Sequence, residues 1–442
     1  MDEIRQEVAR TPNADAAGNP VYFTIESTGP LATQFVVKDE ASLPFPMANE
    51  VIGSTVALHM TKWTLEKLVA TAYDSNTRRV TLSTAPKDWV LVPEGRFFLM
   101  GKSSFIDQPG EWAWENGSLY LRPSDDQTPT GRSVTVSRSA GGLVVRGVQD
   151  IQIEGVSIQG ADPQAVLIEN SSGISLKKLQ IKDSGRIGIL SQLSNNVKID
   201  DCDISNSGKN GILNYLTDDV TISNNRIKNS GTTVQHIGWG AIFTASSTRV
   251  NILNNAINNS GYHGISASGD DTLVQNNIIE NVCWLWDDCG GIYTNANNGE
   301  RPRTGTIRII GNIVNGMKNT LSGGIYLDDL SHNVIVQDNT IQDVAGFGIY
   351  IHNSYNNSIS GNTIFNSKNP SIWFREDNGN FPVGVTHDNT LTDNLYFPGP
   401  EAWSMVEHVR FFPHENFGTY DRNVFWHDFF HQRRKHQGLS KE

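Results

Sequence analysis

The sequence predicts an all-β protein: a right-handed parallel β-helix preceded by a small antiparallel β domain. One phrase, an apolar alternation followed by Asn and then by an apolar residue two places on, recurs seven times between residues 222 and 396. No segment between 135 and 400 carries the apolar i, i+3, i+4, i+7 stripe of a helix. Short strands that recur every 23 to 33 residues without crossover helices must stack on themselves, coil over coil.

Residues 1–135 do not follow this rhythm, and they predict the antiparallel domain. The alternating runs 64–71 and 79–84 are separated by a polar turn, which is typical of a hairpin. Asn116-Gly117 stands between two further alternating runs and is a strong hairpin signal. We expect this domain to flank the first coil.

Residues 136–400 form the predicted coils, and the recurring Asn has a physical purpose there. At a tight bend its amide can bond the coils above and below, which satisfies backbone groups inside the stack. Cys202 takes the same place in an earlier coil, where a buried free thiol is suitable. Residues 401–442 are aromatic and basic, and we expect them to cap the open end of the stack. The recurring residues are Asn225, Asn255, Asn277, Asn312, Asn339, Asn362 and Asn394.

Composition narrows the classes of partner. The net charge of −12 without a basic stripe excludes a nucleic-acid partner, and no stretch approaches the ~20 apolar residues of a membrane helix. The first twenty residues lack an apolar signal core, which leaves a cytoplasmic protein or one whose signal is absent from this chain. We expect a secreted or periplasmic protein, with a cytoplasmic location as the alternative. For Cys283 and Cys289, two free thiols are a simpler expectation than a disulfide.

A second phrase, Gly-Ile or Ala-Ile, opens each coil and aligns the outward positions into columns. The residue after Ile forms one column: Leu190, Leu213, Phe243, Ser266, Tyr293, Tyr326, Tyr350 and Trp373. The residue three after Ile forms the other: Gln192, Tyr215, Ala245, Ser268, Asn295, Asp328, His352 and Arg375. From the fifth of these coils on, an aromatic stripe therefore runs beside a polar one.

Such a surface predicts carbohydrate binding, because aromatic faces stack on sugar rings and polar groups fix the hydroxyls. We expect Tyr293, Tyr326, Tyr350 and Trp373 to form the sugar platform, and His352, Arg375 and Glu376 to orient hydroxyls. The alternative is an aromatic stack that the N-terminal domain shields.

Acidic residues concentrate in the same coils. Hydrolysis of a glycosidic bond requires two flanking carboxyl groups, one that donates a proton and one that acts as nucleophile or base. Coils rise by about 4.8 Å, so carboxylates on adjacent coils are close enough for repulsion to raise a pKa. We expect Asp288 and Asp328 to form the pair, with Asp329 as the alternative to Asp328. The competing interpretation is that Asp287 or Asp288 caps a turn.

These coils resemble a known family. The runs 288–294, 305–312 and 324–333 resemble the D-G-G-[GA]-I-Y-T … N … G-I-Y-L-D-[DE]-x-S-x-N pattern of right-handed parallel β-helix glycoside hydrolases, the group of β-xylosidase-like and α-fucosidase-like enzymes. The run 105–123 is similar to the signature of the β domain inserted before their coils. The resemblance implies a retaining or inverting glycosidase with acids at Asp288 and at Asp328 or Asp329. Cys289 departs from the pattern, which has Gly there.

The sequence thus predicts a carbohydrate-active enzyme that hydrolyses an oligo- or polysaccharide of plant or microbial origin without metal or cofactor. The alternatives are a polysaccharide lyase, a uronan epimerase and a non-catalytic glycan-binding spike. In a lyase, Arg375 beside His352 would abstract the proton and neutralise a uronate carboxylate, and Ca²⁺ would bind the acids.

Overall fold

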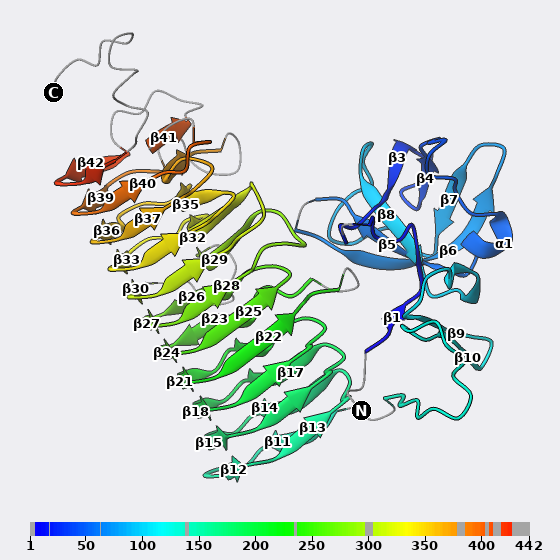
Figure 1. Ribbon diagram of the computed structural model, residues 1–442, viewed down its shortest axis with the longest axis horizontal. Helices are drawn as coiled ribbons and strands as arrows, with labels where there is room; N and C mark the ends of the chain where they lie inside the picture. The colour runs from blue at the N-terminus through cyan, green and yellow to red at the C-terminus, as the bar shows by residue number, and fades with distance from the viewer. Residues whose placement is uncertain are drawn as a thin grey trace, which may run out of the picture. The chain divides into compact units, whose positions relative to one another are not determined.

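The computed structural model describes residues 5–16, 18–61, 63–137, 141–233, 237–296, 304–377, 385–402, 406–409 and 417–426. The chain divides into two compact units. The N-terminal unit comprises Met1–Val136 with Thr233–Ile237, and the coil unit comprises Ser137–Thr232 with Gly238–Glu442. Figure 1 shows both, from the blue N-terminal strands to the orange and red final coils.

The N-terminal unit is a closed antiparallel barrel. Its sheet runs in the order β2-β8-β3-β4-β7-β6-β5, and β5 pairs back to β8. The predicted hairpin is confirmed, because β6 pairs with β7. The elements are β2 (Arg10–Thr11), β3 (Phe23–Thr28), β4 (Gln34–Val37), α1 (Ala48–Val51), β5 (Thr55–His59), β6 (Glu66–Asp74), β7 (Arg79–Leu82), β8 (Arg96–Met100) and the 3-10 helix η1 (Ser103–Phe105).

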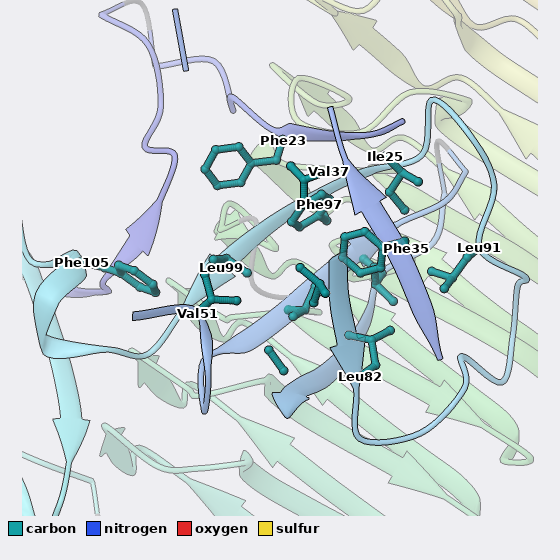
Figure 2. Packing of buried hydrophobic residues seen from close by; sticks show 14 of the residues in the cluster. Phe23, Ile25, Phe35, Val37, Val51, Leu82, Leu91, Phe97, Leu99 and Phe105 are labelled. Carbon is teal, nitrogen blue, oxygen red and sulfur yellow. The ribbon is translucent and has the colours of Figure 1, made fainter. Parts of the chain in front are cut away.

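The barrel encloses an apolar core. Its buried side chains include Phe23, Ile25, Phe35, Phe97 and Leu99 (Figure 2). Phe35 and Phe97 meet edge to face, with ring centroids 4.9 Å apart.

A three-stranded sheet completes this unit. β1 (Glu7–Val8) runs parallel to β9 (Glu111–Glu115), and β9 pairs antiparallel with β10 (Ser118–Arg122). Asn116 and Gly117 have φ of 51° and 78°, as a two-residue hairpin turn of type I′ requires. The second predicted hairpin is therefore confirmed.

The coil unit consists, in its described part, of three eleven-stranded parallel sheets (Figure 1). The first sheet holds β11 (Leu143–Arg146), β14 (Gln164–Glu169), β17 (Ile187–Gln192), β20 (Ile212–Tyr215), β23 (Ile242–Thr248), β26 (Ile265–Asp270), β29 (Cys289–Asn295), β32 (Ser322–Asp328), β35 (Phe347–His352), β38 (Ile372–Arg375) and β41 (Val406–Val409).

The second sheet holds β12 (Gln152–Glu154), β15 (Ser172–Lys177), β18 (Asn195–Asp200), β21 (Asp218–Ser223), β24 (Val250–Leu253), β27 (Thr272–Gln275), β30 (Ile307–Ile310), β33 (Val334–Gln337), β36 (Ser358–Ser360), β39 (Asn389–Thr392) and β42 (Gly418–Asp421). The third holds β13 (Ser157–Gln159), β16 (Gln180–Lys182), β19 (Asp203–Ser205), β22 (Arg226–Ser230), β25 (Ala256–Ser260), β28 (Ile278–Glu280), β31 (Ile313–Asn315), β34 (Thr340–Gln342), β37 (Thr363–Phe365), β40 (Leu395–Phe397) and β43 (Val424–Phe425).

The recurring Asn forms the predicted ladder between the second and third sheets. Asn277 shows the pattern: its Nδ2 donates to Asn312 Oδ1 at 2.9 Å and to the Ile252 carbonyl at 2.9 Å. Its Oδ1 accepts from the backbone and the side chain of Asn255. Cys202 lies at the head of the ladder, buried, with its N–H donating to Asn225 Oδ1. Each amide thus satisfies backbone groups at the bend and ties two coils together.

The stack extends further than we expected. The sequence predicts a cap after residue 400, but β41, β42 and β43 add one more coil. Asn394 Nδ2 donates to Asn423 Oδ1 at 2.9 Å, so the ladder also continues. The run 420–425 repeats the Asn phrase in a weaker form, which hid this coil in the sequence. Residues 427–442 of the expected cap lie outside the described residues.

Two further findings concern cysteines and membranes. Cys283 and Cys289 form a disulfide, with Cα atoms 5.9 Å apart, so the expectation of two free thiols is wrong. The loop between them returns to the start of β29, which brings the two within bridging distance. Among the described residues, no helix has the length and apolar character needed to cross a membrane.

Candidate active site

The outward columns of the first sheet align as the sequence predicted. Tyr293, Tyr326, Tyr350 and Trp373 are partners in consecutive register on β29, β32, β35 and β38. The isoleucines before them are fully buried on the other face of the same strands. Residues distant in sequence are therefore brought onto one wall.

The tyrosines do not present exposed faces, contrary to the expected sugar platform. Tyr293, Tyr326 and Tyr350 are 6%, 1% and 2% exposed. The Tyr326 and Tyr350 rings stack at 4.2 Å and 13°. Glycine makes this packing possible, because a Cβ at Gly323 would lie only 3.0 Å from the Cβ of Tyr350. The rings support one another, and the hydroxyl groups of Tyr293 and Tyr326, not the ring faces, reach acidic residues.

His263 extends the aromatic column and was missed in the sequence. Its ring stacks on Tyr293 with centroids 4.1 Å apart. Its Nδ1 accepts the N–H of Gly290 at 3.0 Å, which leaves the proton on Nε2. Burial lowers the pKa of His263 to about 3, so this imidazole stays neutral.

Asp328 lies at the centre of a charged cluster. Its Oδ2 accepts the Tyr293 hydroxyl at 2.7 Å, and its Oδ1 lies 2.6 Å from His352 Nδ1. The other nitrogen of His352, Nε2, lies 2.9 Å from Asp377 Oδ2. Asp328 is 7% exposed, and both of its oxygens are occupied.

The charges in this cluster follow from these contacts. Burial by itself would lower the pKa of His352, but hydrogen bonds to Asp328 and Asp377 outweigh it and raise this pKa to about 10. Burial would raise the pKa of Asp328, but the bond to His352 and the imidazolium charge hold it below its ordinary value. Asp328 and His352 thus form a buried ion pair.

Asp288 and Asp329 differ from Asp328 in their bonding. Asp288 Oδ1 accepts the Tyr326 hydroxyl at 3.0 Å, and Asp329 Oδ1 accepts Asn353 Nδ2 at 2.8 Å. The Oδ2 atoms of Asp288 and Asp329 have no hydrogen-bond partner among the described residues. Burial, followed by the negative charge of Asp328, raises the pKa of each to about 6.

The backbone around Asp288 is firmly held. The disulfide closes the loop immediately before β29, next to Asp288. The backbone carbonyl of Asp288 accepts the Tyr262 hydroxyl at 2.9 Å, and the backbone N–H of Asp288 donates to the Leu321 carbonyl at 3.0 Å. The carboxylate of the neighbouring Asp287 accepts Asn319 Nδ2, a side-chain amide of the next coil.

The last coil of the site supplies accessible groups. Arg375 Nε lies 2.9 Å from Asp377 Oδ1, and its guanidinium stands over the Trp373 ring at 5.7 Å. Glu376, expected to orient hydroxyls, is 1% exposed, whereas its neighbour Asp377 joins the cluster. Both acids follow β38, which ends at Arg375, so the alternation of the strand does not assign their faces.

Other contributors were also missed. Asn295 Nδ2 donates to the Tyr293 hydroxyl at 2.9 Å, and Asn353 bonds Asp329. Asn295 is in the polar column itself, so its position was a usable signal. The sequence also predicts that the loop 295–306 forms a wall of the cleft, and residues 297–303 of this loop lie outside the described residues.

Three ligand-type residues lie close together here. Donor atoms of Asp328, Asp329 and His352 are within 4.8 Å of one another. Both imidazole nitrogens of His352 are already bonded to carboxylates, however, so the imidazolium supplies the positive charge that a cation would bring. The arrangement fits proton transfer better than metal binding.

Comparisons agree with the fold. The family described as the right handed beta helix region matches residues 119–283 and 230–397, and the chain belongs to this family. No curated protein sequence matches the chain.

Solved structures resemble the chain to different degrees, all at low sequence identity. A glycoside hydrolase has a TM-score of 0.59 at 12% identity, over 95% of this chain and 76% of that one. The A-module of the Azotobacter vinelandii mannuronan C-5 epimerase AlgE4 has a TM-score of 0.49 at 13% identity, over 64% and 76%. The catalytic unit of a GH87 alpha-1,3-glucanase from Streptomyces thermodiastaticus has a TM-score of 0.38 at 15% identity, over 96% and 99%.

Proposed function

We propose that this protein is a glycoside hydrolase whose acid pair is Asp288 and Asp329. The observation that carries the proposal is that two half-buried carboxyl groups from neighbouring coils flank the buried charge of Asp328, and each has one oxygen without a hydrogen-bond partner in the part of the chain that the structure describes. Two such groups are what cleavage of a glycosidic bond requires. The sequence resemblance to β-helix glycoside hydrolases of the β-xylosidase-like and α-fucosidase-like group supports the same chemistry.

The electrostatics give the pair complementary states. Burial and then the negative charge of Asp328 raise the pKa of both carboxyl groups to about 6, and the charge of Asp329 adds to the rise at Asp288. Close to that pH, one carboxyl holds a proton while the other is ionised. The protonated group would donate its proton to the glycosidic oxygen as the C–O bond breaks. The ionised group would attack the anomeric carbon, or take a proton from the water that does so.

Asp328 then has a different role from the one we expected. Both of its oxygens are bonded and it is nearly inaccessible, so Asp329 is the better partner for Asp288. As a permanent charge, Asp328 would keep the acid of the pair protonated at a pH where an ordinary aspartate is ionised.

Substrate contacts would fall on the more exposed residues beside the pair. Trp373 and Arg375 are partly exposed and come from the coil after His352. The buried tyrosines would act through their hydroxyl groups, which orient Asp288 and Asp328. Three contacts of 3.0, 3.3 and 2.6 Å join Asp288 Oδ1 to Asp328 Oδ1 through Tyr326 and His352.

A panel of neutral polysaccharides and chromogenic glycosides tests the proposal. We expect release of reducing sugar without the ultraviolet absorbance of an unsaturated uronate, and losses of about a thousandfold or more in kcat for Asp288→Asn and for Asp329→Asn. Unsaturated products from an acidic polysaccharide would instead establish a lyase. Asp287→Asn, which changes the neighbouring turn residue, is the matched control and should keep most activity.

The disulfide bears on where the protein acts. Disulfides persist in oxidising compartments and are rare in the cytosol of mesophiles, so Cys283–Cys289 supports our proposal of a secreted or periplasmic enzyme.

A further inference from the structure

A hollow lies on the early coils of the coil unit. It is a groove of about 540 Å³, within the range of roughly 300–1,000 Å³ that ligand sites occupy. Its lining repeats from coil to coil, at the bend between the first and second sheets. The lining residues are Gly147, Asn170, Leu193 and Leu216 at the outer bend, Val148, Ser171 and Ser194 behind it, and Gln149, Ser172, Asn195 and Asp218 at the entry to the second sheet.

The groove is polar but nearly uncharged. It contains no Lys, Arg or His, and Asp218 is its one ionisable residue. The exposed amides of Gln149, Asn170 and Asn195 offer both donors and acceptors. Leu193 and Leu216 form an apolar stripe among them, one coil apart. Neutral hydrogen-bonding groups beside an apolar stripe match the hydroxyls and ring faces of a neutral sugar, whereas a polyanion would meet no cation.

The two leucines are not explained by the fold. Leu193 and Leu216 have φ of 51° and 50°, in the left-handed region that a bulky side chain rarely adopts. Many other coil bends place Asn or Asp at such positions, for example Asn206, Asn229 and Asn254. Leu193 is 52% exposed, so its burial does not compensate for the backbone conformation. Contact with a ligand would account for leucine there.

We propose that this groove is an accessory site that binds a neutral polysaccharide along the axis of the coils. Coils rise by about 4.8 Å, close to the length that one sugar unit adds to an extended chain, so Leu193 and Leu216 can contact neighbouring units. These leucines directly follow β17 and β20, as Asp329 follows β32, so the groove and Asp329 lie on the same corner of the stack. The role as a remote subsite for long substrates rests on the proposed function, but the binding itself does not.

Affinity electrophoresis tests the binding without requiring turnover. Gels would contain arabinoxylan, mixed-linkage β-glucan or galactomannan, with alginate as the polyanion. We expect at least one neutral polysaccharide to retard the full chain and alginate not to do so. The Leu193→Asn/Leu216→Asn variant should bind about tenfold more weakly, although Asn suits the left-handed backbone better and should leave the thermal midpoint unchanged or higher.

Two further variants make the result specific. Asn195→Ala leaves the bend intact and should also weaken retardation. Lys178→Asn changes an exposed residue with φ of 52° outside the groove and should have no effect. The proposal is overturned if no neutral polysaccharide retards the wild-type chain, or if the double leucine variant is retarded as strongly as the wild type.

The same gels separate this proposal from the proposed function. Asp329→Asn should be retarded like the wild type, because the acid pair is not part of the groove. Retardation without any release of sugar from the same polysaccharides would refute the hydrolase and leave the accessory site standing.

Discussion

Asp328→Asn is the substitution that best separates a tuning charge from a reacting group. It keeps the size of the side chain and removes the negative charge next to His352. The acid of the pair must be protonated to act, so activity falls as the pH rises through its pKa. Loss of the Asp328 charge lowers that pKa, and the alkaline limb of the rate profile should therefore move to lower pH.

The size of the shift follows from the contacts. Three contacts connect Asp288 Oδ1 to Asp328 Oδ1 through Tyr326 and His352. These two oxygen atoms can therefore lie no farther apart than the sum of the three contact distances. Two charges about 8 Å apart interact by about 2 kcal/mol at an effective dielectric constant of about 20, which corresponds to about 1.5 pKa units. Burial is the largest cause of the rise of the Asp288 pKa to about 6, and the substitution leaves it in place.

The assay is the pH dependence of kcat/KM on the best polysaccharide of the panel, measured from about pH 4 to 8 around the expected pKa values. A fall of about 1.5 units in the pKa reduces the protonated fraction about thirtyfold at pH 7, and activity should return below about pH 5. A thousandfold loss at every pH would refute this reasoning and make Asp328 itself the nucleophile or base. An unchanged profile would show that its charge does not act on the pair.

The remaining predictions concern stability and metal dependence. The pKa of His352 is raised from 6.5 to about 10, so the stabilisation from its ion pair is complete below pH 6.5 and is lost as the pH rises through 10. In thermal melts, the His352→Gln variant should be less stable than the wild type at pH 7, and this difference should vanish above pH 10. Asn277→Ala leaves buried donors of Asn255 unsatisfied and should lower the free energy of unfolding by about 2–4 kcal/mol in urea titrations, whereas Asn258→Ala should change it by less than about 0.5 kcal/mol. Activity should survive EDTA, since the imidazolium supplies the cationic charge; a loss that Ca²⁺ restores would favour a lyase.

Much of the fold could be predicted because the coil repeat leaves a direct record in the sequence. Each buried Asn of the ladder and each Ile of the first sheet recurs in register, so alignment of the repeats alone gave the strand partners of Tyr326 and Tyr350. The final coil was missed because Asn423 stands in a weaker form of the same phrase.

The register of the candidate residues could be predicted, whereas their exposure could not. The alternation of side chains along the strands placed Asp328, His352 and Arg375 on one face of the sheet. It contains no information on how far other residues bury the side chains of that face. The rings of the tyrosines pack on one another because Gly290 and Gly323 leave room for them, and this depends on contacts between coils. Asp377 could not be preferred over Glu376 because a strand's alternation cannot be followed past its last paired residue.

The central claim is that Asp288 and Asp329, forty-one positions apart in the sequence, act as one unit because their coils are stacked. The most direct test compares kcat for the Asp288→Asn and Asp329→Asn variants with kcat for the double variant, since residues that act as a unit show strongly non-additive losses. The structure predicts that either single substitution removes nearly all turnover and that the second adds little. Losses that multiply, or a single variant that keeps most of its activity, would contradict it.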